Sequence, residues 1–151
     1  MPANDLTITA QWKINQYTIT FNTDGGSGID PITADYGTSI TTPAAPSKEG
    51  YTFTGWDPEV PATMPANDLT ITAQFAINEY KITFYDEDGT TVLQTLEVGH
   101  GSMPAPTVPT KEGTAEYTYA FDKWTPALEE ATADATYTAQ FTSTINEYTI
   151  S

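Results

Sequence analysis

Apolar and polar residues alternate in short runs along most of the chain. In the first run, Leu6, Ile8, Ala10 and Trp12 are separated by polar residues. A period of two predicts a β-strand with one buried face. Similar runs rich in Thr, Tyr, Phe and Ile, which suit a pleated surface, lie at residues 17–21, 51–56, 69–75, 80–84, 117–121 and 135–141. The pattern therefore predicts a mainly β protein with little helix.

Turn signals separate these runs. The segments Asp24-Gly25-Gly26 and Asp86-Glu87-Asp88-Gly89 each follow a predicted strand. Clusters of Asp and Gly in this position are typical of hairpin loops. The second strand of each hairpin is weakly marked, near residues 31–36 and 92–98.

Proline limits helix in the second half of each unit. Residues 43–46 and 104–109 are proline-rich, and proline inside a helix removes a backbone donor and clashes with the preceding turn. Residues 127–133 are expected to form a single helical turn.

The chain repeats itself. Met1–Gln11 returns without a change as Met64–Gln74, and the segment that begins at Tyr17 returns at Tyr80 and, shortened, at Tyr148. Both segments first recur 63 positions on (64 − 1 and 80 − 17). Self-similarity at a fixed period indicates a tandem array.

The repeats predict four parts of the chain. We expect residues 1–16 to be the closing strand of a preceding, truncated repeat with its linker, and residues 17–79 to be the first unit. Residues 80–147 form a divergent second unit with an insertion near 114–118, and residues 148–151 begin a third. Length differences between the units are expected in loops. Units this small bury only about 60% of their unfolded surface, so neighbouring units are expected to support each other.

The predicted junctions are short. Apolar residues occupy even positions through Ile14 and odd positions from Tyr17, and the same switch occurs between Phe75 and Tyr80. A shift of one residue moves side chains to the opposite face of a strand, so the chain must bulge, turn or cross to a new sheet there. The junctions contain no Gly, Ser or Pro. We therefore expect stiff linkers and an elongated, semi-rigid rod.

The charge excludes several classes of partner. Twenty acidic residues face five Lys, for a formal net charge of −15. Such a charge repels nucleic acid and anionic lipid.

The chain contains no Cys, which excludes disulfides and thiolate metal sites. No apolar run approaches the ~18 residues of a membrane span, so membrane insertion of this segment is not expected.

The sequence offers only weak candidates for a catalytic or metal-binding site. His100 is the only His, and Pro104 stands where a Gly-x-Ser-x-Gly motif would need its last Gly, so a loop His is favoured over a catalytic triad. The acidic segment 86–89 lacks the ligand spacing of a calcium loop and is interpreted as a solvated hairpin tip. No catalytic, cofactor-binding or metal-binding residue is predicted, and no cofactor.

The three Trp residues fit a core better than a sugar-stacking surface. Trp12 aligns with Phe75 on the apolar face of a closing strand, and Trp56 and Trp124 recur once per unit. A small β unit needs a few large aromatic residues to bury enough surface. A Lys–Asn isopeptide crosslink is not favoured, because Lys81 falls on a polar strand face and Lys13 in a junction.

The order of the motifs resembles a known family. Each unit has Tyr-x-Ile-Thr-Phe, a turn with Gly, a proline-rich stretch, Lys-Glu-Gly and a Trp, and the first carries Lys48-Glu49-Gly50-Tyr51-Thr52-Phe53-Thr54-Gly55-Trp56. This is similar to the Listeria–Bacteroides repeat, the B-repeat type of internalin-like bacterial surface proteins. The second unit departs from it with Asp122-Lys123-Trp124. The resemblance implies a β-grasp-like fold with an antiparallel or mixed sheet of about four strands, and no catalytic residues.

These observations favour a non-enzymatic tandem repeat segment of a secreted or cell-wall-associated bacterial surface protein, acting as a stalk or spacer and in adhesion. The alternative is a module that binds a host protein or glycan, with Tyr117, Tyr119 and Phe121 as its surface. Expected partners are neighbouring repeats, a host extracellular protein or glycan, and further copies of the chain through edge strands.

Overall fold

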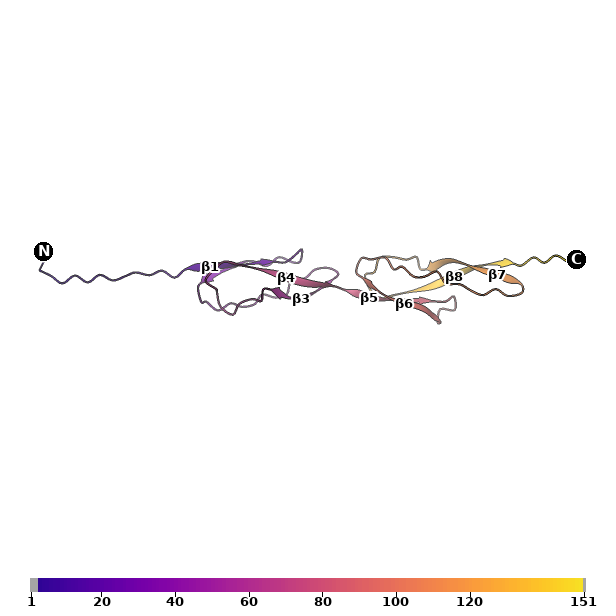
Figure 1. The fold of residues 1–151 in the computed structure, drawn as a ribbon, viewed down its shortest axis with the longest axis horizontal. Helices are drawn as coiled ribbons and strands as arrows, with labels where there is room; N and C mark the ends of the chain where they lie inside the picture. The colour runs from indigo at the N-terminus through magenta and orange to yellow at the C-terminus, as the bar shows by residue number, and fades with distance from the viewer. Residues whose placement is uncertain (1–2, 151) are drawn as a thin grey trace. The chain divides into compact units, whose positions relative to one another are not determined.

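The computed structural model describes residues 3–150, which form two compact units. The first unit takes in the chain up to Glu49 together with Phe53–Phe75, and the second takes in Gly50–Thr52 together with the chain from Ala76 onward. The short segment Gly50–Thr52 thus groups with the second unit, although it belongs to the first sequence repeat. Each unit is built around one sheet (Figure 1).

The first sheet has four strands in the order β2-β1-β4-β3. They are β1 (Gln16–Asn22), β2 (Ile32–Asp35), β3 (Tyr51–Asp57) and β4 (Leu69–Ile77). Strand β1 pairs antiparallel with β2 and parallel with β4, so the sheet is mixed and its two central strands are parallel.

The second sheet repeats this topology in the order β6-β5-β8-β7. Its strands are β5 (Glu79–Tyr85), β6 (Val92–Gly99), β7 (Tyr117–Thr125) and β8 (Ala135–Ile145). Strands β5 and β8 are parallel, and β5–β6 and β7–β8 are antiparallel. The fold class predicted from the sequence is confirmed: two tandem, small, β-grasp-like sheet domains.

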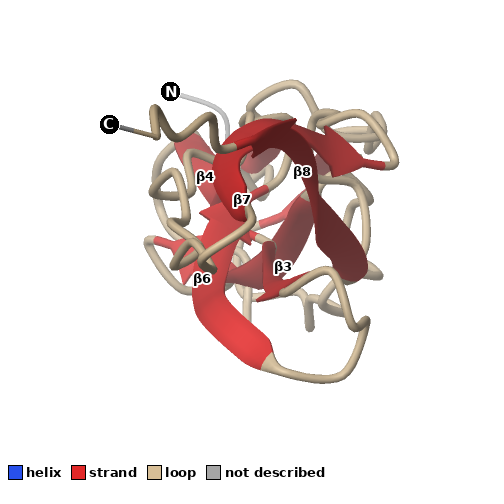
Figure 2. Ribbon diagram, turned by 90° about the vertical axis from the view of Figure 1, so that its right-hand side faces the viewer, coloured by secondary structure: helices blue, strands red, loops and turns tan. Residues whose placement is uncertain are grey.

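No helix forms among residues 3–150, as Figure 2 shows with strands and loops only. The helical turn expected at residues 127–133 is therefore wrong. Ala131 in this segment donates its N–H to the carbonyl oxygen of Ser102 at 2.9 Å and accepts from the N–H of Gly101 at 2.8 Å. These long-range bonds tie the segment to the turn after β6, and the Ala131 side chain lies in the core.

The core of the first unit lies on one face of its sheet. Ile19 and Phe21 of β1 and Ile71 of β4 are buried there with Met64. Met64 donates to the carbonyl of Thr38 at 2.8 Å, which fixes the loop before β4 over the sheet. The alternation that predicts the strands therefore also sets their buried face. Partly buried side chains from strands and loops complete the cluster: Tyr17, Ile29, Ile32, Ala34, Ile40, Trp56, Val60 and Leu69.

The insertion in the second unit lengthens strands as well as a loop. Strand β7 has 9 residues against 7 in β3, and β8 has 11 against 9 in β4. Phe121 and Phe141 pair across these strands, and the pairing continues to Tyr117 and Ile145. The expectation that length differences fall in loops therefore holds only in part, because the extra residues at the start of β7 pair with the extra residues at the end of β8, which gives their backbone groups partners.

Strands β4 and β5 are separated by a single residue, Asn78. The two strands belong to different sheets. Of the three routes that the change of apolar face allowed, the chain therefore crosses to a new sheet.

Residues 6–12 do not form the strand that their alternation predicts. Leu6, Ile8 and Trp12 are 83%, 85% and 92% exposed, and the segment runs into β1 as an extended trace with no strand beside it (Figure 1). A strand gains its hydrogen bonds from a neighbouring strand, and none pairs with this segment. The core position expected for Trp12 is therefore wrong in this chain.

Candidate functional site

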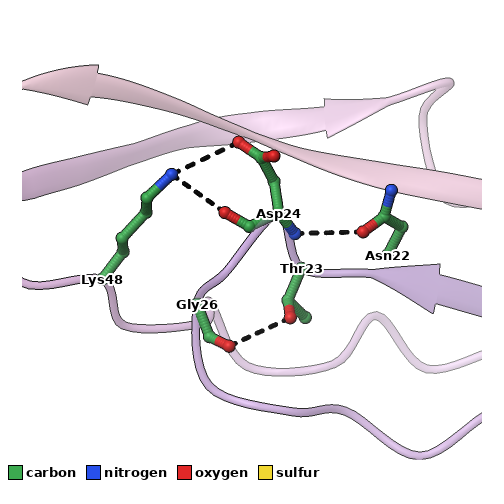
Figure 3. Close-up of polar contacts among 5 residues, drawn as sticks. All are labelled: Asn22, Thr23, Asp24, Gly26 and Lys48. Carbon is green, nitrogen blue, oxygen red and sulfur yellow. Dashed lines mark hydrogen bonds and ion pairs between the residues drawn. The ribbon is translucent and has the colours of Figure 1, made fainter.

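The first hairpin begins with a tight turn at Thr23–Gly26. Gly26 donates its N–H to the carbonyl of Thr23 at 2.8 Å. Both central residues, Asp24 and Gly25, have positive φ angles of 47° and 83°, which is the geometry of a type I′ turn. Asn22 accepts the N–H of Asp24 on its side-chain oxygen at 3.1 Å, and the Thr23 hydroxyl donates to the carbonyl of Gly26 at 3.1 Å (Figure 3).

Lys48 clamps this turn from the segment just before β3. Its Nζ donates to the backbone carbonyl of Asp24 at 2.9 Å and lies 3.3 Å from the Asp24 carboxylate (Figure 3). The same ammonium lies 5.2 Å from the ring centroid of Phe75 in β4. One lysine therefore ties three parts of the first unit together, and an exposed pair of this kind contributes about 0–1 kcal/mol.

The second unit has the same clamp with a different acid. Lys111 Nζ pairs with the carboxylate of Glu87 in the second hairpin loop. It lies 4.2 Å from the ring centroid of Tyr119 and 5.9 Å from that of Phe141. The hydrogen bond to Glu87 raises the pKa of Lys111 above its usual 10.5. The recurrence in both units identifies the lysine of Lys-Glu-Gly as a structural residue.

The acidic hairpin 86–89 uses its carboxylates internally. Asp88 accepts the N–H groups of Thr90 and Thr91, each at 2.8 Å, and the Thr91 hydroxyl. These bonds, led by the Thr91 hydroxyl, lower the pKa of Asp88 from 3.8 to about 2. Asp86 accepts the N–H of Glu87. Within residues 3–150 no three His, Asp or Glu side chains converge on a position for a metal ion.

Each unit carries an aromatic cluster around its Trp. In the first, Trp56 lies edge-on to Phe21 at 5.3 Å and to Phe53 at 5.2 Å, and Phe53 contacts Phe75. Such pairs prefer edge-to-face geometry and contribute about 0.5–1.5 kcal/mol beyond burial. The prediction that this Trp belongs to the core is confirmed.

The same chain of contacts runs through the second unit. Trp124 contacts Phe84 at 4.8 Å and Phe121 at 5.2 Å, and Phe121 contacts Phe141 at 6.0 Å. Trp124 is buried, as predicted. Tyr137 adds a stacked ring on Phe84 that the first unit lacks.

The predicted ligand surface of the second unit is half buried. Tyr117, Tyr119 and Phe121 lie on one face of β7, and the rings of Tyr117 and Tyr119 are 6.5 Å apart. Lys111 covers Tyr119. Lys13 and Lys81, weighed as crosslinking residues, are exposed.

The asparagine at each junction is a structural residue that sequence reasoning missed. Asn78 donates its N–H to the carbonyl of Gly50 at 2.8 Å, and its side-chain oxygen accepts the Thr52 hydroxyl at 2.6 Å. Its own carbonyl accepts the N–H of His100 at 2.8 Å. The backbone N–H, the backbone carbonyl and the side-chain oxygen of Asn78 are therefore all hydrogen-bonded, which restrains its φ and ψ angles.

Parts of this bonding pattern recur at the other two junctions. Asn146 donates its N–H to Glu116 at 2.8 Å and accepts the Thr118 hydroxyl at 2.6 Å, and Asn15 accepts the N–H of Tyr36 at 2.8 Å. The signal was present in the sequence as a recurring tetrapeptide, Ile-Asn-Gln-Tyr or Ile-Asn-Glu-Tyr, at residues 14–17, 77–80 and 145–148.

His100 follows β6 in a turn. Its Nδ1 lies 3.5 Å from the hydroxyl of Tyr80. Its ring also packs so closely on Gly50 that a Cβ there would lie 2.1 Å from a ring carbon. Gly50 has a φ of 75°, a left-handed conformation that favours glycine. Packing against the junction thus accounts for the placement of His100.

Residues 3–150 contain no helix of the length and apolar character that crossing a membrane requires.

Similar proteins share short regions with this chain. It is 32% identical over 162 aligned residues to a protein of Evansella cellulosilytica named "Putative Gly-rich membrane protein", with 99% of this chain and 18% of that protein covered. It is 43% identical over 88 residues to Internalin H of Listeria monocytogenes, with 52% of this chain and 16% of that protein covered. The chain therefore spans less than a fifth of these relatives.

A solved structure of Streptococcal High Identity Repeats in Tandem (SHIRT) domains 3–4 from a cell surface protein is 23% identical in sequence to this chain. The superposition covers 87% of this chain and 99% of that chain, with a TM-score of 0.39. The profile of the Listeria-Bacteroides repeat domain matches residues 17–74 and 80–150, which take in most of each sheet. This chain belongs to the Listeria-Bacteroides repeat family.

Proposed function

We propose that the chain is a non-enzymatic spacer in a longer bacterial surface protein, where tandem units hold other parts of that protein away from the cell. Three features support this role. The two units have the same sheet topology, the same lysine clamp and the same aromatic contacts around Trp. Structural features recur between the units, whereas the candidate chemical groups, His100 and the acidic hairpin, do not.

The observation that carries the proposal is the junction of one residue. A spacer transmits distance only if its linkers are stiff, and flexible linkers behave as random coils. Here the linker is the single residue Asn78, whose N–H, carbonyl and side-chain oxygen all form hydrogen bonds. At Asn146 the N–H and the side-chain oxygen are bonded in the same way, which supports a restraint of this kind in each repeat.

Small-angle X-ray scattering of the 151-residue chain tests this role. A compact chain of this length has a radius of gyration of about 15 Å, and the spacer requires a value well above it. A matched variant that inserts Gly-Ser-Gly-Ser-Gly after Asn78 should broaden the distance distribution. A radius near 15 Å, or scattering unchanged by the insertion, would contradict the spacer role.

A second role in binding a host protein or glycan rests on the surface formed by Tyr117 and Tyr119. These two rings are neighbours at 6.5 Å and half buried, and Tyr117 lies in the insertion that the first unit lacks. Binding of the chain to a glycan or host-protein array, lost in the variant Tyr117→Ala/Tyr119→Ala and kept in Tyr36→Ala, would support this role. Equal signals from all three proteins would count against it.

A further inference from the structure

Both units place their first and last strands side by side at the centre of the sheet. In the first unit β1 and β4 are neighbours and parallel, with β2 and β3 at the edges. In the second unit β5 and β8 are neighbours and parallel, with β6 and β7 at the edges. The first strand of each sheet is therefore hydrogen-bonded directly to the last strand of the same sheet.

We propose that this parallel pair of strands, called here the central ladder, bears tension along the chain and keeps each unit folded under load. The central ladder of the first unit consists of β1 and β4 with Asp68, and that of the second consists of β5 and β8 with Asp134. Load bearing goes beyond the proposed spacer function, because a spacer has to be stiff but does not have to resist being pulled apart.

The direction of the load follows from the parallel pairing. Tension along the chain pulls β1 towards its amino-terminal end and β4 towards its carboxyl-terminal end. Because the two strands run in the same direction, these pulls are opposed along the strand axis and make the strands slide past each other. The hydrogen bonds of a parallel pair are evenly spaced, so sliding loads all of them at the same time.

The buried face of the central ladder opposes the same movement. The ladder of the first unit covers four residue pairs, of which Ile19–Leu69 is the first. Ile19 and Phe21 of β1 are buried together with Ile71 of β4. A slip of one residue moves the apolar side chains of a strand to the opposite face. Sliding therefore has to break the backbone bonds and disrupt the core together.

An aspartate extends each central ladder beyond its first residue pair. The carboxylate of Asp68 accepts the N–H of Thr18 at 2.8 Å, and that of Asp134 accepts the N–H of Lys81 at 2.9 Å. The donor is a backbone group, so the bond is present in both units although the donor residues differ. Thr18 lies between the pulled end of β1 and the first pair. This bond to an ionised acceptor, which is about twice as strong as a neutral one, is therefore the first to bear load on that side.

The two central ladders are connected in series. Only Asn78 separates β4 from β5, so tension that leaves the first ladder enters the second through one residue. The edge strands β2, β3, β6 and β7 lie outside the direct path of the force. The mechanical strength of each unit is therefore expected to depend on its central ladder.

Single-molecule force spectroscopy of the 151-residue chain tests this expectation. One handle is attached to the amino terminus and the other to a single introduced Cys, since the chain has none of its own. In Ala76→Cys the force slides β1 along β4. In Asp35→Cys it opens the antiparallel pair β1–β2 from the end at which Gln16 pairs with Asp35. Strands β5–β8 bear no load in either chain.

The two pulling points should give different forces at the same loading rate. We expect the rupture force of the Ala76→Cys chain to be about twofold or more above that of the Asp35→Cys chain, because its ladder bonds break together and not one pair at a time. Rupture should lengthen the Ala76→Cys chain by about 180 Å and the Asp35→Cys chain by about 60 Å. Equal rupture forces at these lengths would overturn the proposal.

A matched pair of substitutions tests the aspartate in the Ala76→Cys chain. Asp68→Ala removes the bond to Thr18 and should lower the rupture force by about a fifth, as expected for one of roughly five bonds loaded together. The control is Asn67→Ala, since the Asn67 side chain donates to the carbonyl of Asp68 at 2.8 Å, and its rupture force should be unchanged. Equal forces in these two variants would refute the part assigned to Asp68. If Asp68→Ala does not fold, the comparison of pulling points, which retains Asp68, still decides the proposal.

Discussion

The two copies of one sequence allow a direct test of how much burial contributes to stability. Replacing Ile71 by Ala removes three carbon atoms from a fully buried side chain in a central strand. At ~0.8 kcal/mol for each buried methylene the loss of burial is ~2.4 kcal/mol, and the cavity raises the cost to about 3–4 kcal/mol. The same substitution at Ile8, which is 85% exposed, should change stability by less than ~0.5 kcal/mol.

This cost is large for a unit of this size. A domain of some sixty to seventy residues has a free energy of unfolding of roughly 3–10 kcal/mol, so Ile71→Ala removes a third of it or more. For domains of this size each kcal/mol shifts Tm by ~4–8 °C. We therefore expect the first unit to melt roughly 12–30 °C lower in Ile71→Ala and at an unchanged temperature in Ile8→Ala.

Urea unfolding followed by tryptophan fluorescence measures the effect in each unit. Trp56 lies in the first core and Trp124 in the second. In a Trp12→Phe background, chains that retain only Trp56 or only Trp124 separate the two transitions. Equal midpoints for Ile71→Ala and Ile8→Ala in the Trp56 transition would refute the assignment of β4 as the buried closing strand.

Two further predictions concern single groups. Gly50→Ala should destabilise the chain more than Gly37→Ala, because both have positive φ but only the first meets the His100 ring. The left-handed backbone costs about 1–2 kcal/mol at each and the clash a further ~1–3 kcal/mol. Addition of His100→Ala should recover much of this extra loss in thermal unfolding, and no recovery would contradict the clash. Thr91→Val should raise the pKa of Asp88 from about 2 towards 3.8, as measured by NMR titration of the side-chain carboxyl. Because the folded pKa is depressed, the stabilisation from this carboxylate is complete above pH 3.8 and is lost as the pH falls towards 2. An unchanged pKa in the variant would show that the Thr91 hydroxyl is not its cause.

Much of the fold could be predicted from local pattern. The alternating runs from residue 17 onward were located correctly as strands, because side chains on a pleated strand point alternately to opposite faces. The core position of Trp56 and Trp124 followed from their recurrence once per unit, since equivalent positions in equivalent folds bury the same side chains. The lysine clamps could not be found in this way, because Lys48 and Asp24 are 24 positions apart and meet only when the turn and the loop before β3 come together.

The junction shows a similar limit. The switch of apolar face near Asn78 indicated a change of direction or of sheet. It did not show that the polar groups of one asparagine would be bonded to Gly50, Thr52 and His100. Bonds between residues distant in sequence depend on the assembled sheets.

The sequence by itself determined the repeat, the strand segments and the family, because these depend on the order and spacing of residues along the chain. It could not determine which strands are buried. Leu6–Gln11 and Leu69–Gln74 have identical residues and propensities, yet only the second is a strand with a buried Ile. Burial and strand hydrogen bonds require a partner beside the segment, and for Leu69–Gln74 the tertiary structure supplies β1 and β3 on its two sides.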